Sequence, residues 1–124
     1  MINPYKSAIE ACVRCAQDCE RYAAEFAGTM GKTVRFCLDA AELCWAAATL
    51  MSRGSRITPE ICQLSARACE ICANECDKSP DEQLTDCAET CRACAEQCLK
   101  VAEDGPFDMA VQGSSVSASL ATTV

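Results

Sequence analysis

Histidine is absent from this sequence. Its absence removes the commonest general acid–base group of enzymes and the commonest metal ligand, so a metal site would have to use thiolate, thioether or carboxylate groups. The sequence also has no Ser-His or Cys-His combination for nucleophilic catalysis and no glycine-rich phosphate-binding loop. We therefore expect that the protein is not an enzyme.

A long hydrophobic run is missing too. No segment approaches the ~20 apolar residues that a membrane-spanning helix needs. The first residues, "MINPYKSAIEACVRC", lack the apolar stretch of a secretory signal, which predicts a cytoplasmic protein. Positive charge is in the minority, with 11 Lys and Arg against 18 Asp and Glu and a formal net charge of −7. This balance argues against nucleic acid and anionic membrane surfaces as partners.

Cysteine, by contrast, is abundant, with 13 copies in 124 residues. Such a density is often read as a secreted disulfide scaffold. Here the count is odd, which leaves at least one thiol free, and the cysteine-containing segments have helical rather than loop-rich patterns. In a cytoplasmic protein the thiols stay reduced, and a cysteine pattern of this kind indicates metal or redox chemistry.

The chain is long enough for one domain, and helix start and stop signals divide it into four segments. Three starts are marked by Asn3 before Pro4, by Thr58 before Pro59, and by Ser79 in capping-box register with Glu82. The predicted helices run approximately over residues 4–28, 32–53, 59–78 and 80–104. Short connections make consecutive helices antiparallel neighbours. We therefore predict an all-α, up-down-up-down four-helix bundle over residues 1–105.

The last residues, 106–124, differ from the rest in composition. They are rich in serine, valine and alanine, and Asp108 is their one charged residue. We predict an irregular C-terminal tail, and we expect it to pack on a neighbouring protomer of a homo-oligomer.

One cysteine phrase, C-x-x-C-A-x-x-C, occurs three times, starting at Cys12, Cys69 and Cys91. At ~100° per residue, the cysteines of each predicted helix fall on a single stripe of that helix. The opposite faces carry charged and polar residues, so the cysteine stripes should face the core. The predicted metal ligands are all 13 thiols: Cys12, Cys15, Cys19, Cys37, Cys44, Cys62, Cys69, Cys72, Cys76, Cys87, Cys91, Cys94 and Cys98.

Packing and disulfides explain these thiols poorly. Cysteine can serve as a small buried hydrophobe, but a core of cysteine and alanine would be under-filled unless something occupies it. Cysteines at i, i+3 or i+4 have Cβ atoms about 5–6 Å apart, which exceeds the ~3.8 Å of a disulfide. A metal ion suits the wider gap, and the pairs that could bridge one along a single helix are Cys15/Cys19, Cys72/Cys76, Cys87/Cys91 and Cys94/Cys98.

Charge favours Cu(I) among the candidate metals. Buried thiolates are costly without compensation, and one monovalent ion per thiolate leaves a neutral core. Soft thiolates also bind zinc and iron–sulfur clusters. Zinc or general heavy-metal sequestration and a thiol redox buffer therefore remain open. An iron–sulfur electron carrier fits less well, because the bacterial ferredoxin spacing C-x2-C-x2-C-x3-C with a following proline is missing.

The phrases "ARACEICANECDK" and "ETCRACAEQCLK", with the "GSRITPEIC" segment before them, resemble the cysteine-rich four-helix-bundle copper storage proteins of bacteria. The resemblance covers residues 5–103. It implies a dimeric or tetrameric cytoplasmic bundle that stores many Cu(I) ions through thiolates inside each protomer. A copper chaperone or efflux system would be its partner.

Some positions depart from the family pattern. Ser65 stands on the inner stripe where a thiol is expected, and Ala41 and Ala48 hold inner positions. The resemblance implies histidines or methionines where copper enters, and Met30 and Met51 are the candidates in this chain. Each of the two methionines also fits ordinary packing.

Overall fold

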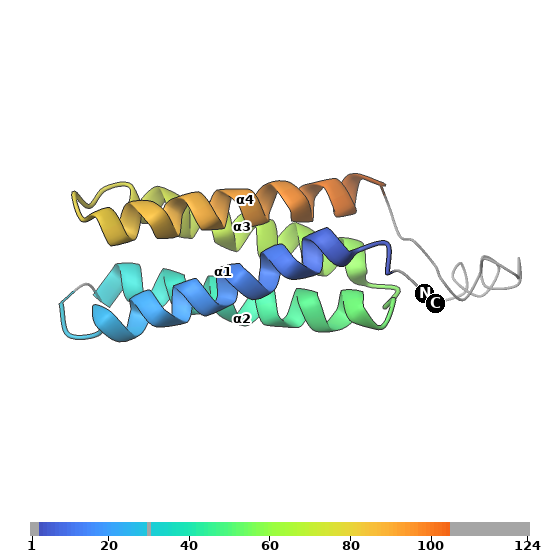
Figure 1. Cartoon of the computed structure of the whole chain (residues 1–124), viewed down its shortest axis with the longest axis horizontal. Helices are drawn as coiled ribbons and strands as arrows, with labels where there is room; N and C mark the ends of the chain where they lie inside the picture. Colours follow the sequence, from blue (N-terminus) through green and yellow to red (C-terminus); the bar gives the residue numbers. More distant parts are fainter. Residues whose placement is uncertain (1–2, 30, 105–124) are drawn as a thin grey trace, which may run out of the picture.

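The computed structural model describes residues 3–29 and 31–104. Its helices are α1 (Lys6–Glu25), α2 (Gly31–Ser52), α3 (Thr58–Cys76) and α4 (Glu82–Asp104), and the described residues contain no strand. The predicted all-α bundle is confirmed (Figure 1). The predicted tail, 106–124, lies outside the described residues, and so does Met30.

The helices run up, down, up and down, and each packs on the next, while α1 also packs on α4 and closes the bundle (Figure 1). Two ends result. We name the Tyr5 end after the buried side chain at the start of α1, beside the end of α2 and the start of α3. The Tyr22 end lies opposite, where α1 connects to α2 and α3 connects to α4.

Two helix starts differ from the predictions by one or two residues. Tyr5 and not Asn3 is the N-cap of α1, because the Asn3 side chain forms a turn in which its Oδ1 accepts the Tyr5 backbone N–H at 2.7 Å. Thr58 lies inside α3, and Ile57 is the N-cap. The Thr58 hydroxyl donates to the carbonyl oxygen of Ser55 at 2.6 Å, so it is not available to cap the helix.

The predicted capping box at α4 is wrong. Asp81 takes the capping position, and its Oδ1 accepts the Gln83 backbone N–H at 2.8 Å. Ser79 instead accepts the Asp81 backbone N–H at 3.2 Å, which forms the turn before the helix. A side chain of aspartate competes well for this local bond, and α4 therefore begins at Glu82.

The end of α2 follows the prediction. Gly54 has a φ of 63°, a conformation that glycine adopts without the steric cost of a side chain. The Ser55 backbone N–H then reaches the Leu50 carbonyl at 3.0 Å, and the Gly54 N–H reaches Met51 at 3.2 Å. These are the two bonds of a Schellman motif, and they stop the helix at the predicted place.

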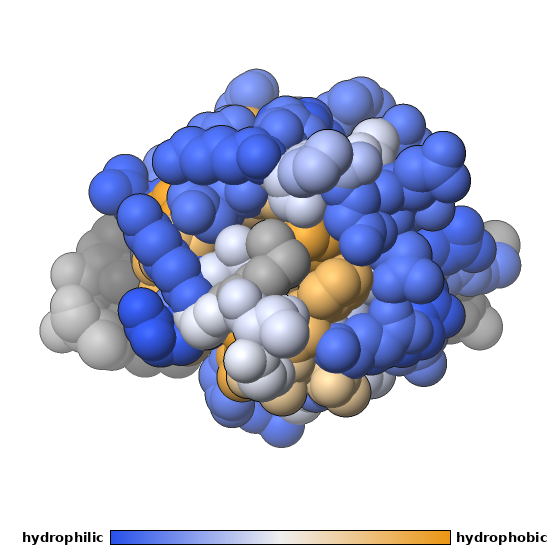
Figure 2. Space-filling view, turned by 90° about the vertical axis from the view of Figure 1, so that its left-hand side faces the viewer, coloured by the Kyte–Doolittle hydropathy of each residue, from blue (hydrophilic) through white to orange (hydrophobic). Residues whose placement is uncertain are grey.

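Cysteine and alanine make up most of the core, while the larger buried side chains lie toward its ends. Tyr5, Met51 and Thr58 are buried at the Tyr5 end, and Tyr22 and Leu84 at the Tyr22 end. Figure 2 looks onto the Tyr22 end and shows hydrophobic side chains in the middle of this face, framed by hydrophilic ones. The bundle therefore has a polar surface around a narrow core of small residues.

Candidate metal centre

All 13 cysteines lie in the interior, each with at most 1% of its surface exposed. They are free thiols. The inward direction predicted from the helical period is thus confirmed for every cysteine, whereas their role as metal ligands stays a prediction. Small neighbours such as Ala16, Ala73 and Ala95 accompany them, so sulfur atoms of different helices can approach each other closely.

One group of four thiols takes one cysteine from each helix: Cys15, Cys44, Cys69 and Cys94. Their Sγ atoms all lie within 4.8 Å of one another. The Cys15–Cys69 and Cys44–Cys94 distances are both 3.7 Å, and they join helices that lie diagonally across the bundle. We call these residues the Cys44 group. They place four sulfur atoms on the bundle axis.

A second group of four repeats this arrangement nearer the Tyr22 end. It consists of Cys19, Cys37, Cys72 and Cys87, again one from each helix and mutually within 4.8 Å. Cys72 lies 3.5 Å from Cys37, and Cys19 lies 3.8 Å from Cys87. We call these residues the Cys37 group. Cys76 continues it, with its Sγ 4.0 Å from Cys72.

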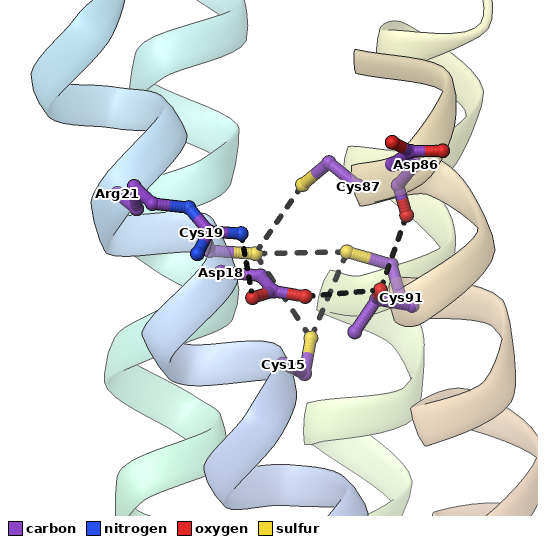
Figure 3. A network of polar contacts seen from close by, with 8 residues as sticks. Cys15, Asp18, Cys19, Arg21, Asp86, Cys87 and Cys91 are labelled. Atoms are coloured by element: carbon purple, nitrogen blue, oxygen red, sulfur yellow. Dashed lines mark hydrogen bonds and ion pairs between the residues drawn. The ribbon is translucent and has the colours of Figure 1, made fainter. Parts of the chain in front are cut away.

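Cys91 connects the two groups. Figure 3 shows its sulfur pointing toward Cys15 and Cys19, at 3.7 and 3.6 Å. Cys15 and Cys19 are themselves 3.9 Å apart, one in each group. The three thiols form a triangle of mutual neighbours, so the sulfur atoms form a continuous ladder along the axis.

Toward the Tyr5 end the ladder narrows to Cys12, Cys94 and Cys98. Cys12 lies 3.4 Å from Cys98 and 3.7 Å from Cys94. Cys62 is the last thiol at this end, with Cys98 as its interaction partner. Ser65 is fully buried where the stripe predicts a thiol, and its Oγ lies 3.4 Å from Cys44.

Three of the four predicted same-helix pairs are in direct contact. Cys15/Cys19, Cys72/Cys76 and Cys94/Cys98 have Sγ–Sγ distances of 3.9, 4.0 and 4.0 Å. Cys87 and Cys91 are joined through Cys19, which lies 3.8 and 3.6 Å from them.

These separations indicate how many sulfurs would share an ion. With a metal–sulfur bond of ~2.3 Å, two sulfurs in a linear site lie about 4.6 Å apart, in a trigonal site about 4.0 Å and in a tetrahedral site about 3.8 Å. The contacts of 3.4 to 4.0 Å suit shared ions, and the sulfurs of each group lie within 4.8 Å of one another, a range that also includes the separation of a linear bridge. The core therefore offers groups of three and four thiols that can share an ion.

Hydrogen bonds among the thiols set their acidity. Hydrogen bonding to Cys12, and then to Cys69 and Cys94, lowers the pKa of Cys44 to about 5. Bonds to Cys15, Cys19 and Cys69 raise the pKa of Cys91 instead, and burial adds to the effect. One thiolate in such a cluster is stabilised by hydrogen bonds from its protonated neighbours. The same hydrogen bonds oppose the ionisation of those neighbours. A metal ion that replaces the protons would remove this opposition.

The protein itself supplies no buried positive charge to balance thiolates. All of its 11 lysine and arginine side chains are exposed. Met51 is fully buried at the Tyr5 end, where it fills the core. Any negative charge that develops on the ladder must therefore be balanced by the bound ions themselves.

The sequence did not indicate one contact that fixes α1 against α4. The Thr90 hydroxyl donates to Asp18 Oδ2 at 3.1 Å, and Arg21 binds the other carboxylate oxygen at 3.1 Å (Figure 3). This contact depends on the relative rotation of two helices far apart in sequence, so no local pattern could have shown it.

No helix in the described part of the chain is long and apolar enough to cross a membrane.

The comparison with curated proteins gives no match. Solved structures do match. The chain is 33% identical to apo copper storage protein 3 of Bacillus subtilis, with a TM-score of 0.75 over 78% of this chain and 97% of that one. It is 31% identical to a Cu(I)-bound structure of the Bacillus protein, with a TM-score of 0.75 over 78% and 96%.

A structure described as a cytosolic copper storage protein from Streptomyces lividans with five coppers is 30% identical, with a TM-score of 0.75 over 80% of this chain and 92% of that one. The sequence profile of the copper storage protein family matches residues 1–103. This match spans the whole sulfur ladder and all but the last residue of α4. The chain therefore belongs to the copper storage protein family.

Proposed function

We propose that this protein stores and buffers Cu(I) in the cytosol, holding many ions through the thiolates of its core and catalysing no reaction. The observation that carries the proposal is the continuous ladder of 13 buried thiols with no buried cation beside it. The cytosolic location is supported by the Streptomyces relative that is described as cytosolic. A chaperone that delivers the copper, or an efflux system that removes it, fits the same role.

The charge of the ion decides between Cu(I) and divalent metals. Four thiolates around a divalent ion keep a net charge of −2 in the core, and no basic side chain lies inside to balance it. Monovalent copper neutralises one thiolate per ion, and its low coordination number suits sulfurs that are shared between neighbouring sites. A filled ladder of Cu(I) is therefore close to neutral.

An anaerobic titration with Cu(I) against a competing chelator tests the proposal. Saturation at about one ion per cysteine is expected, because this ratio neutralises the core. Saturation at about one ion per four cysteines would instead indicate tetrahedral sites of the kind that divalent metals form. It would contradict storage by the whole ladder.

Zinc sequestration is the second candidate, and the two four-helix groups favour it. In the Cys44 group, the distances of 3.5 Å to Cys69 and 3.7 Å to Cys94 are close to the ~3.8 Å edge of a tetrahedral zinc site. A competition experiment distinguishes the two functions. Cu(I) added to zinc-loaded protein should displace all zinc, whereas retention of zinc under excess Cu(I) would support sequestration.

We also propose that a second copy covers the groove between α2 and α3. This groove, of about 380 Å³, has Phe36, Leu43, Leu64 and Ile71 in its walls. Leu64 and Ile71 are 49% and 40% exposed. Exposed apolar surface of this kind on a soluble helix face marks a contact site.

Charges at the rim identify a second copy as the occupant. Asp39 and Glu42 of α2 and Arg67 of α3 line the groove, and none of them pairs with another described residue. A two-fold axis parallel to the bundle would place α2 of one protomer against α3 of the other. Arg67 would then face the partner's Asp39 and the partner's Glu42, which is the self-complementarity that a symmetric dimer needs.

A charge swap tests this interface by sedimentation. Arg67→Glu should weaken the oligomer because it places like charges across the axis, and Arg67→Glu combined with Glu42→Arg should restore it. A monomeric wild-type protein, or an Arg67→Glu variant that assembles as well as the wild type, would contradict the interface.

A further inference from the structure

Both ends of the sulfur ladder are closed by side chains larger than cysteine. At the Tyr5 end, Tyr5, Met51 and Thr58 are at most 6% exposed. At the Tyr22 end, Tyr22 and Leu84 are at most 7% exposed, and hydrophobic side chains occupy the middle of the end face (Figure 2). Among the described residues, neither end presents an accessible thiol to an incoming ion.

The side of the bundle offers another route to the thiols. A groove of about 430 Å³ runs between α1 and α4, and Cys94, which is itself fully buried, adjoins it. Three other surface hollows, one between α2 and α3 and two between α3 and α4, contain no cysteine in their walls. The groove therefore approaches the ladder from the side of the bundle, away from the large side chains at its two ends.

Cys94 is also well connected to other thiols of the ladder. Its Sγ lies 3.7 Å from Cys12 and 3.7 Å from Cys44, and 4.0 Å from Cys98. It belongs both to the Cys44 group and to the triangle near the Tyr5 end. An ion bound at Cys94 thus reaches two parts of the ladder by exchange between adjacent sulfurs.

The residues around the groove suit a polar carrier. Ala11 and Ala93 leave space above Cys94, and Arg14, Glu89 and Glu96 surround it with charge. None of these three charged side chains pairs with another described residue. They are free to contact the ammonium and carboxylate groups of a small peptide thiol that carries Cu(I).

We propose that Cu(I) enters the core sideways, through the α1–α4 groove, by transfer from a small-molecule thiolate complex to Cys94. This inference rests on the proposed storage function. In the transfer, a bond forms between copper and Cys94 Sγ while one copper–sulfur bond of the carrier breaks. The Cys94 thiol proton passes to the released carrier thiolate, and copper stays in the +1 state throughout.

Filling the groove tests the route. Ala11→Phe narrows the space over Cys94, and Ala93→Phe does the same from an exposed position on α4. The matched control is Ala68→Phe, because Ala68 is half-buried like Ala11 but lines the α2–α3 groove, whose walls contain no cysteine. Stopped-flow uptake of Cu(I) from a glutathione complex gives the rate, and the anaerobic titration gives the final capacity. Sedimentation of each variant shows whether its oligomeric state is that of the wild type.

Both groove variants should take up Cu(I) about tenfold or more slowly, an added barrier of ~1.4 kcal/mol or more, and reach the wild-type capacity. Ala68→Phe should load at the wild-type rate. Wild-type rates in Ala11→Phe and Ala93→Phe would overturn the lateral route, and so would equal slowing in all three variants. If Ala11→Phe fails to fold, the exposed Ala93→Phe decides alone. A low capacity in the wild-type protein would contradict the storage function instead, so the two failures are distinguishable.

Discussion

The two halves of the core differ in how they are filled. Toward the Tyr22 end every helix contributes a thiol to the Cys37 group, and Cys76 and Cys91 adjoin it. Toward the Tyr5 end, Ser65 and Met51 occupy inner positions of α3 and α2, and Cys62 is the last thiol. Both halves contain a group of four thiols, but Ser65 interrupts the α3 stripe between Cys62 and Cys69, whereas Cys72 has Cys37 and Cys76 as thiol neighbours. Capacity and stability of the empty protein should therefore respond to different substitutions.

The largest contrast is expected in copper capacity. Cys72→Ala removes a sulfur that contacts both Cys37 and Cys76, so every ion that it would share loses a ligand. Cys62→Ala removes a thiol at the edge of the ladder, with Cys98 as its partner. Anaerobic titration should show that Cys72→Ala loses more ions per chain than Cys62→Ala. Equal losses would mean that the two halves store copper alike.

Stability of the empty protein should show the opposite order. Met51 is fully buried, and Met51→Ala should destabilise the apo protein by about 2–5 kcal/mol, the usual cost of such a cavity. Cys72→Ala removes one sulfur atom and should cost less than Met51→Ala. Chemical denaturation of the apo proteins measures both effects. Half-buried Leu50, its neighbour on α2, provides the control Leu50→Ala, which should cost less than Met51→Ala.

Adding a thiol where Ser65 interrupts the α3 stripe should sharpen the comparison. Ser65 is fully buried with its Oγ 3.4 Å from Cys44 Sγ, so Ser65→Cys places a sulfur next to the Cys44 thiol. Capacity should rise by about one ion, since each added thiolate neutralises one Cu(I). Ser65→Ala should leave the capacity unchanged, because the hydroxyl is not a preferred ligand of a soft ion. An unchanged capacity in Ser65→Cys would show that this half lacks space for another ion.

Much of this architecture follows from the sequence, and the remainder depends on distances between helices. The number of helices and the inward direction of every thiol follow from a period of ~3.6 residues, which is local. The start of α4 could not be placed to the residue, because Ser79 and Asp81 compete for the same cap. The Cys44 group depends on how far each helix is rotated and shifted against three others. A single sequence contains no direct record of that geometry.

The smallest expected effect is the pH dependence of the apo protein. Hydrogen bonds to Cys15, Cys19 and Cys69 raise the pKa of Cys91 above its ordinary value of 9.0. Above pH 9 the unfolded chain releases this proton and the folded chain keeps it, so the stability that is present below pH 9 is lost as the pH rises. The melting temperature of the apo protein should fall between pH 9 and 10. Cys62, at the Tyr5 end, has fewer neighbours that raise its pKa.

Cys91→Ala should therefore reduce the alkaline loss of stability more than Cys62→Ala does. Copper-loaded protein serves as the control, since its thiols have already exchanged their protons for metal. Its melting temperature should change less over the same range. An apo protein whose stability is constant from pH 7 to 10 would mean that the thiol hydrogen bonds in the Tyr22 half do not hold their protons in the fold.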